Sequence, residues 1–203
     1  METRKINKGR MAYLNKYKKM KNKIITLGLI SLIFFACKKE KDIVSLPPPI
    51  TNSPELITSI ELQFRDSANT SNLITAKYRD PDGPGGNSAV QFDSVKLQAN
   101  KTYFVDLLLF DETKNPIDTV SKEIFNERDE HQFFFEHSNT ISTLYLDVDT
   151  KGLPIGLKTK WRTKNSSLGT SKVILKHQTN GTKNGSVSTG ETDVEVTFKN
   201  KVQ

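Results

Sequence analysis

The stretch KTYFVDLLLF, residues 101–110, decides the fold class of this 203-residue chain. Its apolar residues fall at every second position, and successive side chains of a β-strand point to opposite faces, so the stretch predicts a strand with one buried face. The alternation recurs through the second half of the chain, where no segment shows the 3.6-residue apolar stripe of a helix. The alternating positions are Tyr103, Val105, Leu107 and Leu109; Ile60, Leu62 and Phe64; Leu144, Leu146 and Val148; Leu157, Thr159 and Trp161; Val173 and Leu175; and Val194, Val196 and Phe198.

Turn-forming residues separate these strand signals, and the order of signals predicts the architecture. Segments rich in Asp, Asn, Gly and Pro lie at residues 80–87, 111–116, 150–154 and 178–191. We therefore expect an all-β fold over residues 55–203, a single antiparallel β-sandwich of about eight to ten strands. Residues 121–130, SKEIFNERDE, are expected to form a helical turn that leads into the next strand.

The beginning of the chain predicts a lipoprotein signal peptide at residues 1–36. The apolar run Ile24–Ala36 has 13 residues, whereas a membrane-spanning helix needs about 20. Lysines precede this run, and FFA before Cys37 resembles the lipobox of bacterial lipoproteins, with Phe34 in place of the usual Leu. We expect translation to start at Met20 and cleavage to leave a lipidated Cys37.

Cys37 is the only cysteine of the chain, so no intramolecular disulfide forms. A buried thiol or a free nucleophile are the alternatives to lipidation, but the flanking lysines do not suit a core and the position lies in a leader. Residues 37–54 read as the lipidated cysteine and a proline-rich linker, which in polyproline II form spans up to roughly 50 Å.

Removal of the signal peptide changes the charge of the protein. The full chain has a net charge of +7, but residues 1–36 carry nine of its 30 basic residues and one of its 23 acidic ones. The remaining 21 basic and 22 acidic residues give a net charge of −1. The basic balance that would suggest nucleic acid therefore disappears, and we expect no nucleic-acid partner.

Six segments of the domain resemble, in the same order, an uncharacterised family of small Gram-negative outer-membrane lipoproteins. The resemblance implies an outer-membrane lipoprotein, facing either the periplasm or the cell surface, and a gene beside that of a TonB-dependent receptor, which would be its partner. Members are sometimes labelled a type 1 periplasmic binding fold, an α/β architecture that the strand pattern here does not predict. The segments are ELIT (55–58), DPDGPGG (80–86), DEHQFFF (129–135), GLPIGL (152–157), LKHQ (175–178) and GETDVEV (190–196).

Two pairs of alternate aspartates are candidate calcium ligands, because a hard cation prefers several oxygens on a sharply turning backbone. They are Asp80 and Asp82 beside three glycines, and Asp147 and Asp149 in DVDTKG. Neither pair continues as an EF-hand loop. Turn formation, which favours the same residues, is the preferred interpretation, and a calcium ion is the alternative.

The histidines are candidate ligands for a transition metal or haem. His131 and His137 share one face of a predicted strand, but roughly 20 Å would separate them, which is too far for one ion. A metal site would need His177 to approach either of them from a neighbouring strand. Asp129, Glu130, Glu136 or Asp193 would complete the site. The preferred interpretation is that the histidines are satisfied rim residues that cap a phenylalanine-rich core face, and the metal or haem site is the alternative.

No catalytic signature occurs in the sequence. It lacks a G-x-S-x-G elbow, a phosphate loop, an H-E-x-x-H motif and a dinucleotide fingerprint. We therefore expect a non-enzymatic, membrane-anchored lipoprotein that serves as a binding or accessory module of an outer-membrane transporter. A metal-handling lipoprotein and a purely structural envelope lipoprotein are the alternatives.

Overall fold

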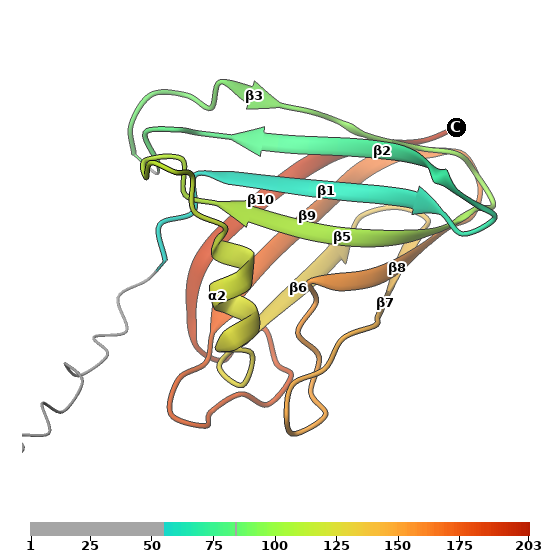
Figure 1. The fold of residues 1–203 in the computed structure, drawn as a ribbon. Coiled ribbons are helices and arrows are strands. Elements are labelled where there is room, and N and C mark those ends of the chain that lie inside the picture. Colours follow the sequence, from blue (N-terminus) through green and yellow to red (C-terminus); the bar gives the residue numbers. More distant parts are fainter. Residues whose placement is uncertain (1–54, 84) are drawn as a thin grey trace, which may run out of the picture. The chain divides into compact units, whose positions relative to one another are not determined.

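Two β-sheets stack face to face in this computed structural model, which describes residues 55–83 and 85–203 (Figure 1). The six-stranded sheet has the order β3-β2-β1-β5-β8-β7, and the four-stranded sheet has the order β4-β10-β9-β6. The first contains β1 (Ser59–Asp66), β2 (Asn69–Arg79), β3 (Gln91–Phe92), β5 (Thr102–Phe110), β7 (Ile141–Tyr145) and β8 (Lys158–Thr163). The second contains β4 (Val95–Leu97), β6 (His131–His137), β9 (Ser167–His177) and β10 (Glu191–Val202).

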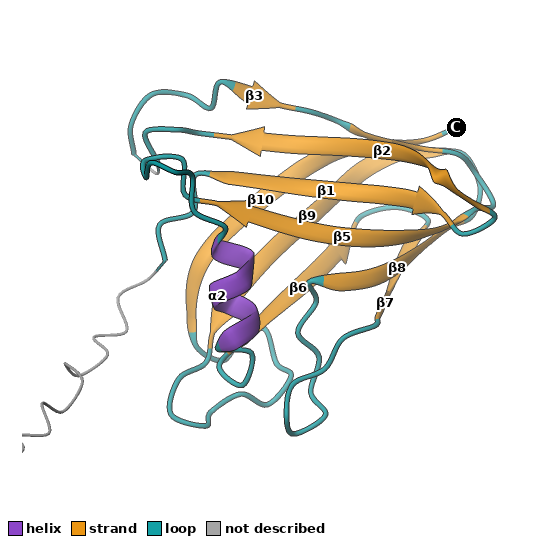
Figure 2. Cartoon of the chain, in the orientation of Figure 1, coloured by secondary structure: helices purple, strands orange, loops and turns teal. Residues whose placement is uncertain are grey.

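The predicted all-β sandwich is confirmed. The described residues form ten strands, and all paired neighbours run antiparallel except β4, which runs parallel to β10. The only helix among them, α2 (Val120–Asn126), precedes β6 as expected for the charged segment 121–130. Figure 2 shows this helix against one end of the strands. No described helix has the length and apolar character to cross a membrane.

The core lies between the sheets and is filled by the alternating residues of β1, β5, β8, β9 and β10. Trp161 on β8 is fully buried, and its ring packs edge-on against Phe64 at 5.3 Å and against Phe135 at 5.6 Å. Since Phe135 belongs to the other sheet, these aromatic contacts join the two layers. Every residue of the core lies within the compact unit 52–203, so we expect that unit to fold alone.

One strand signal does not mark a buried face. β7 ends at Tyr145, and Leu144, Leu146 and Val148 are each about half exposed. The inward positions of β7 are instead those of Ile141 and Tyr145. Because alternate side chains share a face, the outward position of Leu144 on this edge strand continues through Leu146 and Val148.

Candidate metal centre

His131 and His177 lie opposite each other at the ends of β6 and β9. Their rings are stacked, with centroids 4.3 Å apart and planes at 12°. His131 is 0% exposed and His177 is 5% exposed. Of the two candidate partners, His131 and His137, His177 therefore lies beside His131. The pair is buried, however, and does not cap an exposed rim.

Asp193 reaches this pair because β10 contains a β-bulge. The pairing of β10 with β9 shifts between Thr192 and Val194, so Asp193 is the extra residue. A bulge re-aims side chains that regular alternation would place on the other face. Here it turns the Asp193 side chain inward, to 1% exposure, with Oδ2 3.8 Å from Nε2 of His131.

Glu55 supplies a second carboxylate from the segment that precedes β1. Its Oε1 lies 3.5 Å from Nε2 of His131, and its side chain is 11% exposed. The backbone two residues later is fixed, because Ile57 is buried in the core and the amide of Thr58 donates to the carbonyl of Phe110. Three segments far apart in the sequence thus meet at one imidazole nitrogen.

The hydrogen bond of the other ring nitrogen settles the tautomer of His131. Nδ1 lies 3.2 Å from the carbonyl oxygen of Glu127, which only accepts, so Nδ1 carries a hydrogen. Nε2 then carries a lone pair if the imidazole is neutral, and a second hydrogen if the ring is an imidazolium. It is buried and has no hydrogen-bond partner, as is true of Oε2 of Glu55 and Oδ2 of Asp193. Nε2 of His131 and Oδ2 of Asp193 therefore face each other without a hydrogen bond, and the Glu55 oxygen that approaches Nε2 is Oε1, the other oxygen of that carboxylate.

The charges around His131 shift three pKa values. Burial lowers the pKa of His131, but the neighbouring Glu55, the Glu127 carbonyl and Asp193 outweigh it and raise the pKa overall. Burial likewise opposes the effect of His131 on Glu55, whose pKa is nevertheless lowered. Burial and repulsion from Glu55 raise the pKa of Asp193 to about 6. Two carboxylates thus compete for His131, and the neighbouring His177 also acts to lower the pKa of both.

The spacing of the three groups suits a small cation. Their donor atoms lie within 4.8 Å of one another. Tetrahedral zinc with bonds of about 2.0–2.1 Å places its ligand atoms about 3.3–3.4 Å apart. The separations of 3.5 and 3.8 Å are close to that value, whereas they are too long for good hydrogen bonds. A divalent ion with two carboxylates and a neutral imidazole would also be electrically neutral.

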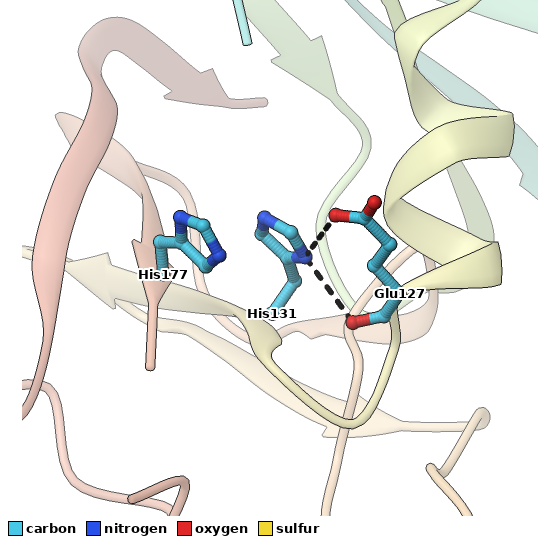
Figure 3. Close-up of side chains that lie close together, drawn as sticks. All are labelled: Glu127, His131 and His177. Carbon is cyan, nitrogen blue, oxygen red and sulfur yellow. Dashed lines mark hydrogen bonds and ion pairs between the residues drawn. The ribbon is translucent and has the colours of Figure 1, made fainter. Parts of the chain in front are cut away.

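A second group shares His131 and is drawn in Figure 3, namely Glu127, His131 and His177. The Glu127 side chain lies beyond the end of α2, with Oε2 3.9 Å from Nδ1 of His131. That nitrogen already donates to the Glu127 carbonyl, and such an orienting bond is typical of the non-ligating nitrogen of a metal-bound histidine. The Nε2 side, with Glu55 and Asp193, is the better ligand set.

The remaining sequence candidates do not belong to the group of Glu55, His131 and Asp193. His137 bonds through Nδ1 to Ser171 at 2.9 Å and through Nε2 to Thr143 at 2.8 Å, and neither described metal-ligand group contains it. Asp129 accepts from the amide and hydroxyl of Thr150. Glu130 lies 3.7 Å from Nε2 of His177, and Glu136 lies 3.9 Å from Lys172.

The aspartates proposed for calcium make hydrogen bonds typical of turns. Asp82 accepts from the amide and side chain of Asn87, and Asp80 accepts from the Tyr78 hydroxyl. Asp147 accepts from two backbone amides, and Asp149 accepts from two others. Neither of the two metal-ligand groups found among the described residues includes any of the four aspartates. The geometry thus favours turn formation, and calcium binding stays a prediction.

Glu55 and Glu127 are the residues that the sequence did not single out. Glu55 is 76 positions before His131, and no local pattern links them. Glu127 is four positions before His131, and the turn between α2 and β6 brings it back. The pairing of β1 with β5 places Glu55, and the end of α2 places Glu127. Neither position can be read from the sequence.

Comparisons with protein families, with curated proteins and with solved structures find no match for this chain. The resemblance to small outer-membrane lipoproteins therefore stays a prediction, and the function is argued from geometry.

Proposed function

We propose that this protein is a lipid-anchored, non-enzymatic envelope protein whose β-domain binds one divalent transition-metal ion through Glu55, His131 and Asp193. The supporting observation is the fully buried Nε2 of His131, which faces two carboxylates without a hydrogen bond. Leaving such groups unpaired in a protein interior is costly, and a cation between them removes that cost.

The donor set favours a borderline metal such as zinc over calcium or haem. Imidazole is a ligand of zinc, copper, iron and nickel, whereas calcium takes oxygen ligands. A porphyrin needs open space beside its axial histidine, but His131 is fully buried and His177 is stacked on it. A bare ion coordinated by one nitrogen and two oxygens, with a position left for water, fits best.

Zinc titration of the full chain, purified in detergent after chelator treatment, tests this proposal. We expect one zinc ion per chain by native mass spectrometry. At a free zinc concentration of 100 times the dissociation constant, binding adds about 2.7 kcal/mol of stability. That corresponds to a rise in Tm of about 5–10 °C for a chain of this size.

Near-isosteric variants separate metal binding from folding. Glu55→Gln and Asp193→Asn should weaken zinc binding at least about tenfold, since each removes an anionic ligand. Without metal, Asp193→Asn should be at least as stable as the wild type, because it removes a repulsive buried carboxylate. His137→Gln is the matched control on the same strand and should bind zinc normally. The proposal is contradicted if zinc leaves the Tm of the wild type unchanged. It is also contradicted if Glu55→Gln and Asp193→Asn bind zinc as tightly as the wild type does.

An accessory role beside a TonB-dependent receptor is the second part of the proposal and is supported by the resemblance in sequence. The neighbouring genes discriminate between the roles. Regulators of metal uptake beside a receptor gene favour the metal-handling role, and a glycan-utilisation cluster favours a general binding role.

A further inference from the structure

A pocket of about 490 Å³ lies between α2, β5 and the start of β8, distinct from the metal centre. Its apolar wall comes from Leu107 and Leu108 on β5, Phe125 on α2 and Leu157 just before β8. Phe125 is 50% exposed, although the other apolar residues of α2, Val120 and Ile124, are in the core. The volume falls in the range of about 300–1,000 Å³ that is usual for small-molecule sites.

Both carboxylates that line the pocket are already engaged. Oδ2 of Asp106 accepts from Nη1 of Arg65 at 2.7 Å. The two oxygens of Asp147 accept from the backbone amides of Gly156 and Lys158, at 2.8 and 2.9 Å. Burial raises the pKa of Asp147 in spite of these bonds. Neither carboxylate is therefore placed to bind a cationic ligand strongly.

The two lysines of the pocket are in the opposite situation. Lys122 on α2 and Lys158 on β8 line the pocket, and within the described part of the chain neither forms an ion pair at 4.0 Å or less. The lysines that do pair nearby, such as Lys114 with Asp118, do so outside it. With Asp106 paired to Arg65, the remaining charges of the lining are those of Lys122, Lys158 and Asp147, so the net charge beside the apolar wall is positive.

We propose that this pocket binds a small amphipathic anion, with its apolar body against Leu108, Phe125 and Leu157 and its anionic group between Lys122 and Lys158. A fatty-acid-like carboxylate is the simplest ligand of this class. The proposal does not depend on the metal centre, because none of the residues that line the pocket belongs to it.

Fluorescence titration of residues 52–203 with dansyl-labelled undecanoic acid, in EDTA, tests the pocket. The wild type should bind the acid with a dissociation constant in the micromolar range and its methyl ester at least about tenfold more weakly. Lys122→Gln/Lys158→Gln should weaken binding of the acid at least about tenfold and leave the ester unchanged. Phe125→Ser, at an exposed helical position, should weaken both.

Lys160→Gln is the matched control, because Lys160 is the next outward-facing lysine of β8 and lies over the Phe104 ring, 5.1 Å from its centroid, outside the pocket. It should bind the acid as the wild type does. Absence of binding, equal affinity for acid and ester, or equal losses in Lys160→Gln and the double variant would overturn the proposal. So would binding to vesicles of anionic phospholipid with none to the monomeric acid, since that result indicates a membrane surface.

Discussion

At the scale of single residues, the charge of the neighbours decides how a buried histidine behaves. His131 and His137 lie on the same strand, yet their pKa values shift in opposite directions. Carboxylates beside His131 raise its pKa. His137 is bonded to two neutral hydroxyls and packs edge-on against Trp161 at 4.5 Å, so burial alone acts and lowers its pKa to about 4. The candidate metal ligand His131 and the structural His137 thus differ in the charge of their partners.

The pH dependence of the free energy of unfolding should show the effect of the lowered pKa of His137. Because its folded-state pKa of about 4 lies below the ordinary 6.5, the unfolded chain takes up the proton first as the pH falls. The contribution of neutral His137 to the free energy of unfolding is complete above pH 6.5. It is lost as the pH falls from 6.5 to 4, and the loss is up to about 3 kcal/mol. Urea unfolding at several pH values should show a smaller loss for His137→Gln than for the wild type. Parallel profiles of the two proteins would contradict this assignment.

At the scale of elements, irregularities position the polar residues. The bulge in β10 turns Asp193 inward, and the loops after β7 and β9 meet through a buried ion pair. Nζ of Lys183 lies 3.0 Å from Oδ2 of Asp149, both side chains are fully buried, and Nζ also donates to the carbonyl of Arg128. This lysine therefore ties together two loops and the turn between α2 and β6, the turn that carries Glu127.

Removal of that lysine should destabilise the domain strongly. Lys183→Met leaves the Asp149 carboxylate buried without a counter-charge, which typically costs about 3–5 kcal/mol. Adding Asp149→Asn should recover part of the loss, because the amide oxygen still accepts from the amides of Lys151 and Leu153. Urea unfolding of both variants measures the effect. A loss below about 1 kcal/mol in the single variant would show that the pair contributes little.

At the scale of the whole molecule, the protein combines a proposed membrane anchor with a domain that has its own core. Cys37, the signal peptide and the linker lie outside the described residues, so the anchor rests on the sequence. Several acyl chains on one cysteine give a stable hold, whereas a single chain gives only a marginal one. With the net charge of −1 expected after cleavage, we propose that the lipid anchor, and not a basic surface, would attach the protein to a membrane.

Metabolic labelling tests the anchor directly. A radioactive fatty acid should label the wild-type protein and should not label Cys37→Ser, because the thiol is the predicted site of acylation. The same gel should show the unprocessed precursor of the variant. Label retained in Cys37→Ser would refute the lipoprotein assignment.

The sequence alone determined the sandwich, because alternation in segments such as residues 101–110 matches the two faces of a strand whatever the rest of the chain does. It also paired His131 with His177 and named Asp193 as one of four completing carboxylates. It misjudged the face of Leu144, since the alternation of a strand does not say which of its two faces meets the other sheet.

Only the tertiary structure selected Asp193, added Glu55 and gave the lysine-lined pocket its shape. The physical reason is that three features follow no periodic pattern in the sequence. They are the bulge in β10, the approach of the segment before β1 to His131, and the position of α2 beside the pocket. These features form only when the strands pair into sheets and the sheets pack together. They position the candidate functional groups of this protein.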